Sequence, residues 1–429
     1  MANVNTLTRR GFLRAASAAG VSLISGCVGL RASHSKPVGR VVVVGGGFGG
    51  STAAKYLRLW SGGAVDVVLV ERNAEFISCP ASNLVLGGSR TIDELTRNYD
   101  GLRKHGVKVV RDEVTAIDPE KKRVSLKHAA DVPYDRLIVS AAVDLMHERI
   151  EGYDVVAQRT VLNAWKAGPE TIALRRQVEA MPDGGVFVLS VPRTPFRCPP
   201  GPYERACQVA SFFKRTKPRS KVIILDANED VASKASLFKA AWNELYKGIV
   251  DYRGNSEVRA IDVRAMAVKT DFDTITGDVL NVLPPMQAAA IARNSGLLSS
   301  KTRWCGVNWL SMESLEHKGI HVLGDATLSA PGMPKSGHMA NNHGKLAAAA
   351  IIELMNGRQP DPLPVIANTC YSYVSDTEAI HVASVHRYDP EKKTLVVVPG
   401  TSGVSPRRNT LEGLYAWGWA RNIWSDMLD

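Results

Sequence analysis

Cysteine is scarce in this sequence, and the motifs that would attach a metal or a haem are missing. The 429 residues include only six cysteines, and no two of them form a C-x-x-C pattern. So few and scattered cysteines exclude a disulfide-stapled scaffold, and the lack of C-x-x-C-H excludes haem c attached to this chain. An oxidising compartment would still permit one or two specific disulfides.

The N-terminal apolar run is too short for a membrane span and belongs to a targeting segment. Residues 15–30 fall short of the ~20 residues that a spanning helix needs, and they follow TRRGFLR at 8–14, a twin-arginine export pattern. We predict that residues 1–34 are a signal segment that directs the chain to the periplasm. Within it, ISGC at 24–27 resembles a lipobox, so lipidation of Cys27 and plain cleavage both stay open. A lipid anchor there would be the one membrane contact.

The remaining chain is moderately basic and has a globular composition. The net charge is +11, of which the arginines of the signal segment account for four, leaving +7. Hydrophobic residues make up 45% and charged residues 22%, which excludes disordered and fibrous classes. We predict no nucleic-acid partner, because export and the lack of arginine–aromatic interleaving argue against one.

A dinucleotide fingerprint opens the chain after the signal segment. The apolar strand pattern at 41–44 runs into GGGFGG at 45–50 and then into a helix pattern at 51–58. A second strand pattern, 65–70, ends at Glu71, twenty-one residues after the last of these glycines, where an acid would hold a ribose hydroxyl. Glycines let the backbone approach a pyrophosphate, and the helix N-terminus offers free N–H groups. The predicted contacts are Gly45, Gly47, Phe48, Gly50 and Glu71.

Two further segments indicate a flavin in an interrupted domain. Residues 134–140 read as a strand that returns to the first domain, and residues 319–325 read as a strand that ends in a Gly-Asp pair. That pair resembles the Gly-Asp of FAD-dependent two-domain reductases, in which the aspartate binds the ribityl-phosphate side of the flavin. We therefore predict FAD as the cofactor and Asp325 as one of its contacts.

The second nucleotide-binding pattern lacks its glycine loop. Between the strand patterns 185–190 and 221–226 lies the stretch 191–205, whose Pro192, Pro195, Pro199 and Pro200 remove amide donors where a phosphate site would need them. NAD(P)H binding is therefore not expected. The stretch instead carries Cys198, where a helix N-terminus would favour a thiolate, and Glu204 in the first turn of that helix. A buried inert thiol and an ordinary helix carboxylate are the alternative interpretations.

These patterns predict an α/β fold with two Rossmann-like three-layer domains and a C-terminal α+β interface domain. The first Rossmann-like domain binds FAD and is interrupted by the second, a degenerate NAD-like domain. An apolar stripe at 411–427 favours core or subunit interface over a membrane anchor. The predicted boundaries are 1–34 for the signal segment, 35–150 and 271–345 for the FAD domain, 151–270 for the NAD-like domain and 346–429 for the interface domain.

Several motifs together resemble one family. They are FRCPPGPYER at 196–205, EGYD at 151–154, AWKAG at 164–168, KPRSKV at 217–222 and MPKSG at 333–337. The sequence resembles the flavoprotein subunit of flavocytochrome c sulfide dehydrogenase, over essentially all of the chain after the signal segment. It departs from that family at residues 140–143, where SAAV replaces a Pro-Gly type of turn, and at Pro80.

The resemblance implies roles for individual residues. It implies a redox-active disulfide between Cys198 and Cys305, an acid/base carboxylate at Glu204 and a thioether between FAD and Cys79. It also implies an aromatic residue near the flavin at Trp419 and further cofactor contacts in the MPKSG segment, Lys335 and Ser336. For Cys207 and Cys370 we predict core positions, although the surroundings of Cys370 match the family.

The resemblance also implies a reaction. A sulfide–cytochrome c oxidoreductase of this type oxidises sulfide to elemental sulfur or polysulfide through the disulfide, and its electrons pass through FAD to haem c on a cytochrome partner subunit. The substrate is expected to be sulfide or a related reduced sulfur compound. Two alternatives stay open: a sulfide:quinone oxidoreductase, and a non-catalytic flavoprotein that supports a sulfur-oxidising complex.

Overall fold

The computed structural model describes residues 38–429. The predicted signal segment, with its twin-arginine pattern at 8–14 and Cys27, lies outside the described residues. Within 38–429, no helix combines the length and the apolar character needed to cross a membrane.

The first sheet is mainly parallel and draws its strands from distant parts of the chain. Its central strand β1 (Gly39–Val44) pairs with β2 (Val65–Glu71) on one side and with β9 (Arg136–Val139) on the other. Strand β21 (Ile320–Val322) pairs with β9, and β5 (Lys108–Arg111) pairs with β2. Val41, Val42 and Val43 are fully buried, as expected for a parallel sheet that is covered on both faces.

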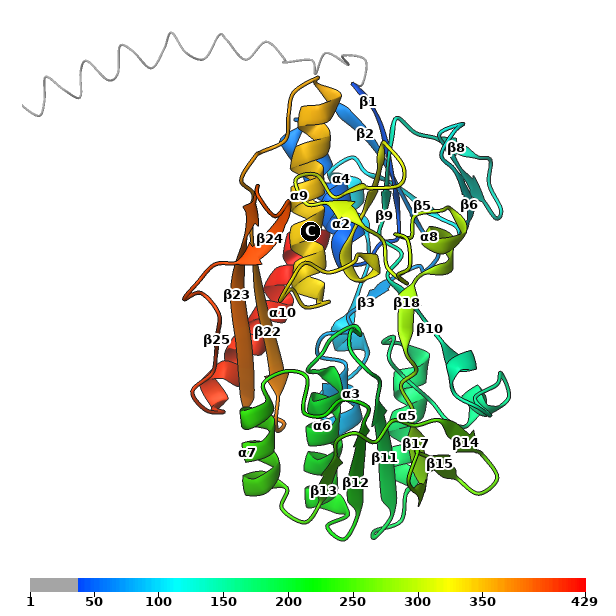
Figure 1. Ribbon diagram of the computed structural model, residues 1–429, viewed down its shortest axis with the longest axis vertical. Coiled ribbons are helices and arrows are strands. Elements are labelled where there is room, and N and C mark those ends of the chain that lie inside the picture. The colour runs from blue at the N-terminus through cyan, green and yellow to red at the C-terminus, as the bar shows by residue number, and fades with distance from the viewer. Residues whose placement is uncertain (1–37) are drawn as a thin grey trace, which may run out of the picture. The chain divides into compact units, whose positions relative to one another are not determined.

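Two long helices pack beside this sheet and against each other. Helix α2 (Phe48–Trp60) follows β1 directly, and α9 (Gly337–Met355) lies next to it in the upper half of Figure 1. A Cβ at Gly344 would lie 2.5 Å from the carbonyl oxygen of Gly49, so the two helix backbones approach closely. This close packing holds the N-terminal end of α2 rigidly beside the carboxyl ends of the strands.

The second sheet is fully parallel and lies in the lower half of Figure 1. Its strand order is β13 (Val250–Arg253), β12 (Lys221–Asp226), β11 (Val186–Val191) and β17 (Val279–Asn281). The sheet thus continues past residue 270. Helices α5 (Pro169–Ala180), α6 (Gly201–Thr216) and α7 (Ala235–Leu245) accompany it. An antiparallel pair, β10 (Val143–Leu145) with β18 (Met286–Ala288), connects this region to the first sheet.

The C-terminal segment forms an antiparallel sheet with a long helix behind it. Strands β22 (Val365–Tyr373), β23 (Ala379–Asp389) and β24 (Thr394–Val397) pair in that order, and β25 (Gly403–Val404) pairs with β23. Helix α10 (Thr410–Leu428) begins at Asn409, whose side chain accepts a hydrogen bond from the backbone N–H of Glu412. This arrangement and the two parallel sheets confirm the predicted α/β class with Rossmann-like layers.

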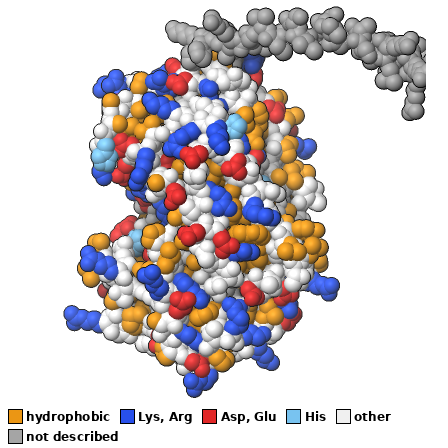
Figure 2. Space-filling model, turned by 180° about the vertical axis from the view of Figure 1, so that it is seen from behind, with side chains coloured by type: hydrophobic (Ala, Val, Ile, Leu, Met, Phe, Trp, Pro, Cys, Tyr) orange, Lys and Arg blue, Asp and Glu red, His pale blue; other side chains and the backbone are white. Residues whose placement is uncertain are grey.

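The large apolar side chains of helix α10 are buried toward its C-terminal end and exposed in its first turns. Trp424 and Met427 are buried, and Lys55 Nζ on α2 donates to the carbonyl oxygens of Ser425 and Asp426 at 3.0 and 2.9 Å. The first turns of the helix instead expose Leu411, Leu414 and Tyr415. Figure 2 shows hydrophobic side chains gathered on the side of the molecule that carries this helix.

The remaining elements are short. Those with residues that line the cavity described below are β3 (Phe76–Ile77), α3 (Asn83–Gly87), β6 (Val114–Asp118) and α8 (Ala290–Asn294). Others in the first part of the chain are β4 (Thr96–Arg97), α4 (Asp100–Lys104), β7 (Arg123–Leu126) and β8 (Val132–Pro133). Those farther along are β14 (Ala260–Asp262), β15 (Ala267–Lys269), β16 (Thr274–Thr276), β19 (Val307–Asn308) and β20 (Glu313–Ser314).

Candidate functional site

A large cavity lies where the two parallel sheets and the C-terminal sheet meet. Its volume is about 1600 Å³, which exceeds the roughly 300–1,000 Å³ of pockets for drug-sized ligands and suits an elongated one. Predicted site residues that line it are Gly45, Gly47, Phe48, Glu71, Cys79, Cys198, Glu204, Asp325, Ser336 and Trp419. The cavity also includes Cys370, whereas Gly50, Cys305 and Lys335 do not line it.

The glycine loop forms one end of the cavity. Gly45 has a φ of +98°, and a Cβ on Gly50 would lie 1.9 Å from the carbonyl oxygen of Gly45. Gly50 therefore lets α2 pack tightly after β1, while the space around a Cβ on Gly47 is open to 4 Å. No side chain caps the N-terminus of α2, so its first N–H groups are available to a pyrophosphate.

Glu71 lies at the end of β2, beside this loop. Its Oε2 accepts a hydrogen bond from the backbone N–H of Gly46 at 2.7 Å, and its Oε1 accepts one from the backbone N–H of Asn73 at 2.8 Å. These bonds fix the carboxylate at the edge of the cavity. The geometry fits the predicted role of holding a ribose hydroxyl.

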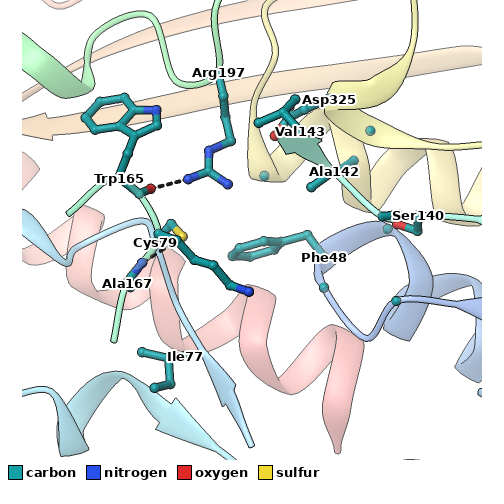
Figure 3. Close-up of a pocket in the computed structure, with 18 of the residues that line it drawn as sticks. Phe48, Ile77, Cys79, Ser140, Ala142, Val143, Trp165, Ala167, Arg197 and Asp325 are labelled. Carbon is teal, nitrogen blue, oxygen red and sulfur yellow. Dashed lines mark hydrogen bonds between the residues drawn. The ribbon is translucent and has the colours of Figure 1, made fainter. Parts of the chain in front are cut away.

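Unpaired buried polar atoms mark a further part of the cavity wall. Among residues 38–429, Asp325 Oδ1 and Trp165 Nε1 are buried without a hydrogen-bond partner, and Figure 3 shows both residues around the same space. Burial raises the pKa of Asp325, and the charges of Arg197 and Lys335 oppose that rise. Buried polar groups normally have partners, so these residues fit a polar group such as the ribityl chain and ring of FAD.

Lys335 does not line the cavity but contacts the segment that carries Asp325. Its Nζ donates to the carbonyl oxygens of Asp325 and Thr327 at 3.0 and 2.5 Å and lies 3.8 Å from the centre of the Trp304 ring. Burial lowers the pKa of Lys335 to about 8. The neighbouring Ser336 does line the cavity and caps α9, since its Oγ accepts from the backbone N–H of Met339 at 3.1 Å.

Cys79 lies around the middle of the cavity, together with aromatic residues. The backbone N–H of Ala167 donates to Cys79 Sγ at 3.5 Å, and Figure 3 shows this thiol beside Trp165 and across from Phe48. Arg197 donates to the carbonyl oxygen of Trp165 in the same view. Trp419 from α10 closes another side and contacts the ring of His338 edge to face at 5.8 Å.

The structure brings Cys198 together with Cys370. Cys198 lies in the turn before α6, Cys370 lies on β22, and both thiols are free, half-buried and part of the cavity wall. Burial raises the pKa of both thiols, and a negative charge on Cys370 raises the pKa of Cys198 further. Because both thiols line the same cavity and the charge of one influences the other, these two cysteines are the candidate redox pair.

The predicted pairing of Cys198 with Cys305 stays a prediction, but the structure leaves Cys305 out of the cavity wall that Cys198 lines. Cys305 is fully buried, and its backbone is bonded to the segment 326–328 through Ala326 and Leu328 at 2.9 and 2.7 Å. Burial raises the pKa of the Cys305 thiol to about 12, and the charge of Lys335 opposes that rise. The backbone hydrogen bonds therefore hold Cys305 beside Lys335, and Cys305 does not line the cavity.

The core position predicted for Cys370 is wrong, because its thiol lines the cavity. The sequence contains a pattern that could have indicated this position. Small polar residues alternate at Asn368, Cys370 and Ser372 along β22, so the three share one strand face. Cys207, in contrast, is fully buried on α6 and accepts a hydrogen bond from Trp242 Nε1 at 3.2 Å, in agreement with its predicted core position.

Glu204 lies in the first turn of α6, close to the cysteine pair. It is 8% exposed; its Oε1 accepts from the backbone N–H of Tyr373 at 2.7 Å and its Oε2 from Asn83 Nδ2 at 2.8 Å. Burial raises the pKa of Glu204 against the effect of these hydrogen bonds. A carboxyl group in this setting can hold and release a proton beside the thiols.

Three family models match successive parts of the chain. Residues 39–161 match "Pyridine nucleotide-disulphide oxidoreductase", and residues 171–284 match the central part of "Sulfide dehydrogenase (flavocytochrome c) flavoprotein chain". Residues 362–428 match "Flavocytochrome c sulphide dehydrogenase, flavin-binding". Together these matches cover strands β1, β2, β5 and β9 of the first sheet, the second sheet and the C-terminal sheet.

Curated relatives and solved structures agree with these matches. The chain is 24% identical to the mitochondrial sulfide:quinone oxidoreductase of Dictyostelium discoideum over 301 residues, 68% of this chain and 66% of that protein, which is just under two thirds of its length. The structure of sulfide:quinone oxidoreductase from Aquifex aeolicus superimposes with a TM-score of 0.74 and 17% identity, covering 92% of each chain. Putidaredoxin reductase, in its covalent complex with putidaredoxin, gives a TM-score of 0.65 at 17% identity, covering 92% of this chain and 96% of that one. At these identities the solved structures show the fold alone.

A short relative carries the name of the family. The sulfide dehydrogenase (flavocytochrome c) flavoprotein chain of Chlorobaculum thiosulfatiphilum is 56% identical over 46 residues, which are 11% of this chain and 94% of that sequence. With the two family models of the same description, this identity confirms the resemblance seen in the sequence. The chain belongs to the family of flavoprotein chains of flavocytochrome c sulfide dehydrogenase.

Proposed function

We propose that this chain oxidises sulfide to elemental sulfur or polysulfide through a disulfide of Cys198 and Cys370. Its electrons would pass through bound FAD to haem c on a cytochrome subunit. The observation that carries the proposal is the placement of both thiols and the Glu204 carboxyl in the wall of the cavity that holds the glycine loop. Membership of a flavocytochrome c family supports the choice of acceptor.

The residues present fit FAD along the length of the cavity. The glycine loop and the N-terminus of α2 would hold the pyrophosphate, Glu71 the adenosine ribose, and Asp325 with Ser336 the ribityl side. Cys79 would form the thioether. When bound, FAD supplies the acceptor for an electron pair and releases electrons singly to a haem.

The cysteine pair would carry the sulfur chemistry. Hydrosulfide forms a bond from its sulfur to one cysteine sulfur, the disulfide bond breaks, and its electron pair stays on the other cysteine as a thiolate. The first cysteine becomes a persulfide, whose proton Glu204 can accept and release. Phe48 and Trp419 are partly buried and give this cavity apolar wall surface.

Sulfide-dependent reduction of the purified holoprotein tests the enzyme directly. We expect anaerobic sulfide to bleach the flavin absorbance within a single turnover. A flavin that stays oxidised would contradict the proposal and leave a non-catalytic flavoprotein as the better reading.

A second candidate, sulfide:quinone oxidoreductase, is favoured by one observation. Leu411, Leu414 and Tyr415 expose an apolar face on α10, which could contact a membrane that contains quinone. Stopped-flow reoxidation of the sulfide-reduced protein by cytochrome c and by a soluble quinone separates the two. We expect the cytochrome to react faster; faster reaction with quinone would favour the second candidate.

We also propose that the chain is exported to the periplasm by the twin-arginine route. The pattern at 8–14 supports this, because that route carries proteins already folded around a cofactor. Replacing Arg9 and Arg10 by lysine should leave the flavoprotein in the cytoplasmic fraction, whereas unchanged periplasmic activity would contradict the proposal.

A further inference from the structure

A buried lysine lies next to the cysteine pair. Lys234 precedes α7 and is 7% exposed; its Nζ donates to the carbonyl oxygen of Cys370 at 3.0 Å and to Ser372 Oγ at 2.8 Å. On the same helix, Lys239 pairs with Asp230 at 2.7 Å in solvent. In the described part of the chain, Lys234 takes part in no such ion pair, so both of its fixed partners are uncharged.

The backbone at Lys234 adopts a conformation that is unfavourable for a side chain. Its φ is +57°, and Cys198 has a φ of +58°. Residues other than glycine rarely adopt this left-handed conformation, and where they do the site is often functional. The fold thus holds both Lys234 and Cys198 in conformations that local preference alone would not select.

The charged and titratable groups around Lys234 come from every neighbouring element. Glu204 faces it from α6, Cys198 from the turn before α6, Cys370 from β22 and Glu412 from α10. From α7 itself, the ring of Phe238 lies with its centre 5.8 Å from Nζ. Two arginines also act on this cluster, since Arg197 influences Cys198 and Arg205 influences Glu204. Lys234 is the cation that influences Cys370, and its Nζ is hydrogen-bonded to the Cys370 strand.

We propose that Lys234 is a positioning residue of the redox pair, whose ammonium group stabilises negative charge on the sulfur of Cys370. The proposal rests on the proposed function. Opening of the disulfide by hydrosulfide places one negative charge on sulfur inside the protein, where burial alone disfavours it. Lys234 offsets that cost without contacting the substrate, because its Nζ is fixed to the backbone and hydroxyl of the strand that carries Cys370.

The same electrostatic effect predicts an order of reactivity in the reduced protein. Burial raises the pKa of Cys370 overall, and the largest effect of a charge on it is the lowering by Lys234. At Cys198 the lowering effects of Arg197 and Lys234 rank below the raising effect of a negative charge on Cys370. The thiolate is the form that reacts with an alkylating reagent. As the pH rises, Cys370 should therefore be alkylated before Cys198.

The test uses the holoprotein with its cysteines reduced. Iodoacetamide labelling is measured across pH by mass spectrometry of the separate cysteine peptides. We expect Lys234→Met to raise the midpoint for Cys370 by about one pH unit or more, while Lys234→Arg and the surface control Lys239→Met keep the wild-type midpoint. An unchanged midpoint in Lys234→Met would overturn the proposal, and the flavin content of each variant shows whether it has folded.

Labelling of the wild-type protein keeps the proposal testable even if Lys234→Met does not fold. Earlier labelling of Cys198 than of Cys370 would overturn it. This measurement needs no sulfide, so it is independent of the proposed function. If sulfide fails to reduce the flavin but Cys370 is still labelled before Cys198, the proposed function is wrong and the role of Lys234 stands. If sulfide reduces the flavin but Cys198 is labelled first, only the role of Lys234 is wrong.

Discussion

The two parallel sheets use the same strand–turn–helix unit in opposite ways. After β1, the turn is made of glycines, and the open space over Gly47 leaves backbone N–H groups facing the cavity. After β11, the turn contains Pro199 and Pro200, and the cavity is lined by the Cys198 thiol and the Glu204 carboxyl instead. Ligands of such sheets bind at the carboxyl ends of the strands. The comparison shows one unit built to hold a phosphate and the other built to present reactive side chains.

The largest expected effect comes from the reactive side chains presented beside the second sheet. Cys370→Ser removes one sulfur of the pair, so sulfide-dependent flavin reduction should fall on the order of 1,000-fold or more while FAD stays bound. Stopped-flow absorbance measures the rate, and the flavin spectrum measures retention. The matched control is Cys305→Ser, which should react within about threefold of wild type because Cys305 lies outside the cavity. The opposite pattern would return Cys305 to the redox pair.

The phosphate-binding turn after β1 can be disrupted by substitution of a single glycine. Gly50→Ala places a Cβ 1.9 Å from the carbonyl oxygen of Gly45, so we expect a loss of more than about 2 kcal/mol in the free energy of unfolding, together with loss of FAD. Denaturant unfolding and flavin content measure the two effects. Gly47→Ala should weaken FAD binding while the stability of the flavin-free protein stays within about 0.5 kcal/mol of wild type. Equal instability of both variants would contradict the different roles assigned to these glycines.

A smaller effect is expected at the carboxyl group of Glu204. Glu204→Gln cannot exchange a proton, so we expect sulfide-dependent reduction to slow by about 100-fold. Because burial raises the pKa of Glu204, its contribution to stability is complete below the ordinary carboxyl pKa and is lost as the pH rises through the raised value. Glu204→Gln should therefore flatten the fall of stability over that window, measured by denaturant unfolding at several pH values. A variant with wild-type rate and wild-type pH dependence would remove Glu204 from the proton transfer.

Local sequence patterns were sufficient to predict the glycine loop of the site. The positions of the other site residues depend on contacts between segments that are far apart in the sequence. The strand, the glycines and Glu71 are close in sequence and have one stable arrangement, so their pattern was sufficient. Cys370 reaches the cavity because β22 lies beside α6 and α9, a placement that no local pattern encodes. Lys335 shares a motif with Ser336, yet its side chain turns toward Thr327 and Trp304.

The C-terminal helix shows the same limit. Its helical periodicity predicted an apolar stripe in the core or at an interface, and the structure buries Met427 while it exposes Leu414. Periodicity identifies an apolar face but not which part of that face the rest of the fold covers. Lys234 lies in no recognised motif, and only the pairing of its Nζ with β22 brings it to the site.

Disulfide mapping of the oxidised holoprotein tests the central claim most directly. Digestion without reductant, followed by mass spectrometry, should recover the peptide that contains Cys198 linked to the peptide that contains Cys370, with Cys305 as a free thiol. A peptide in which Cys198 is linked to Cys305 would contradict the account.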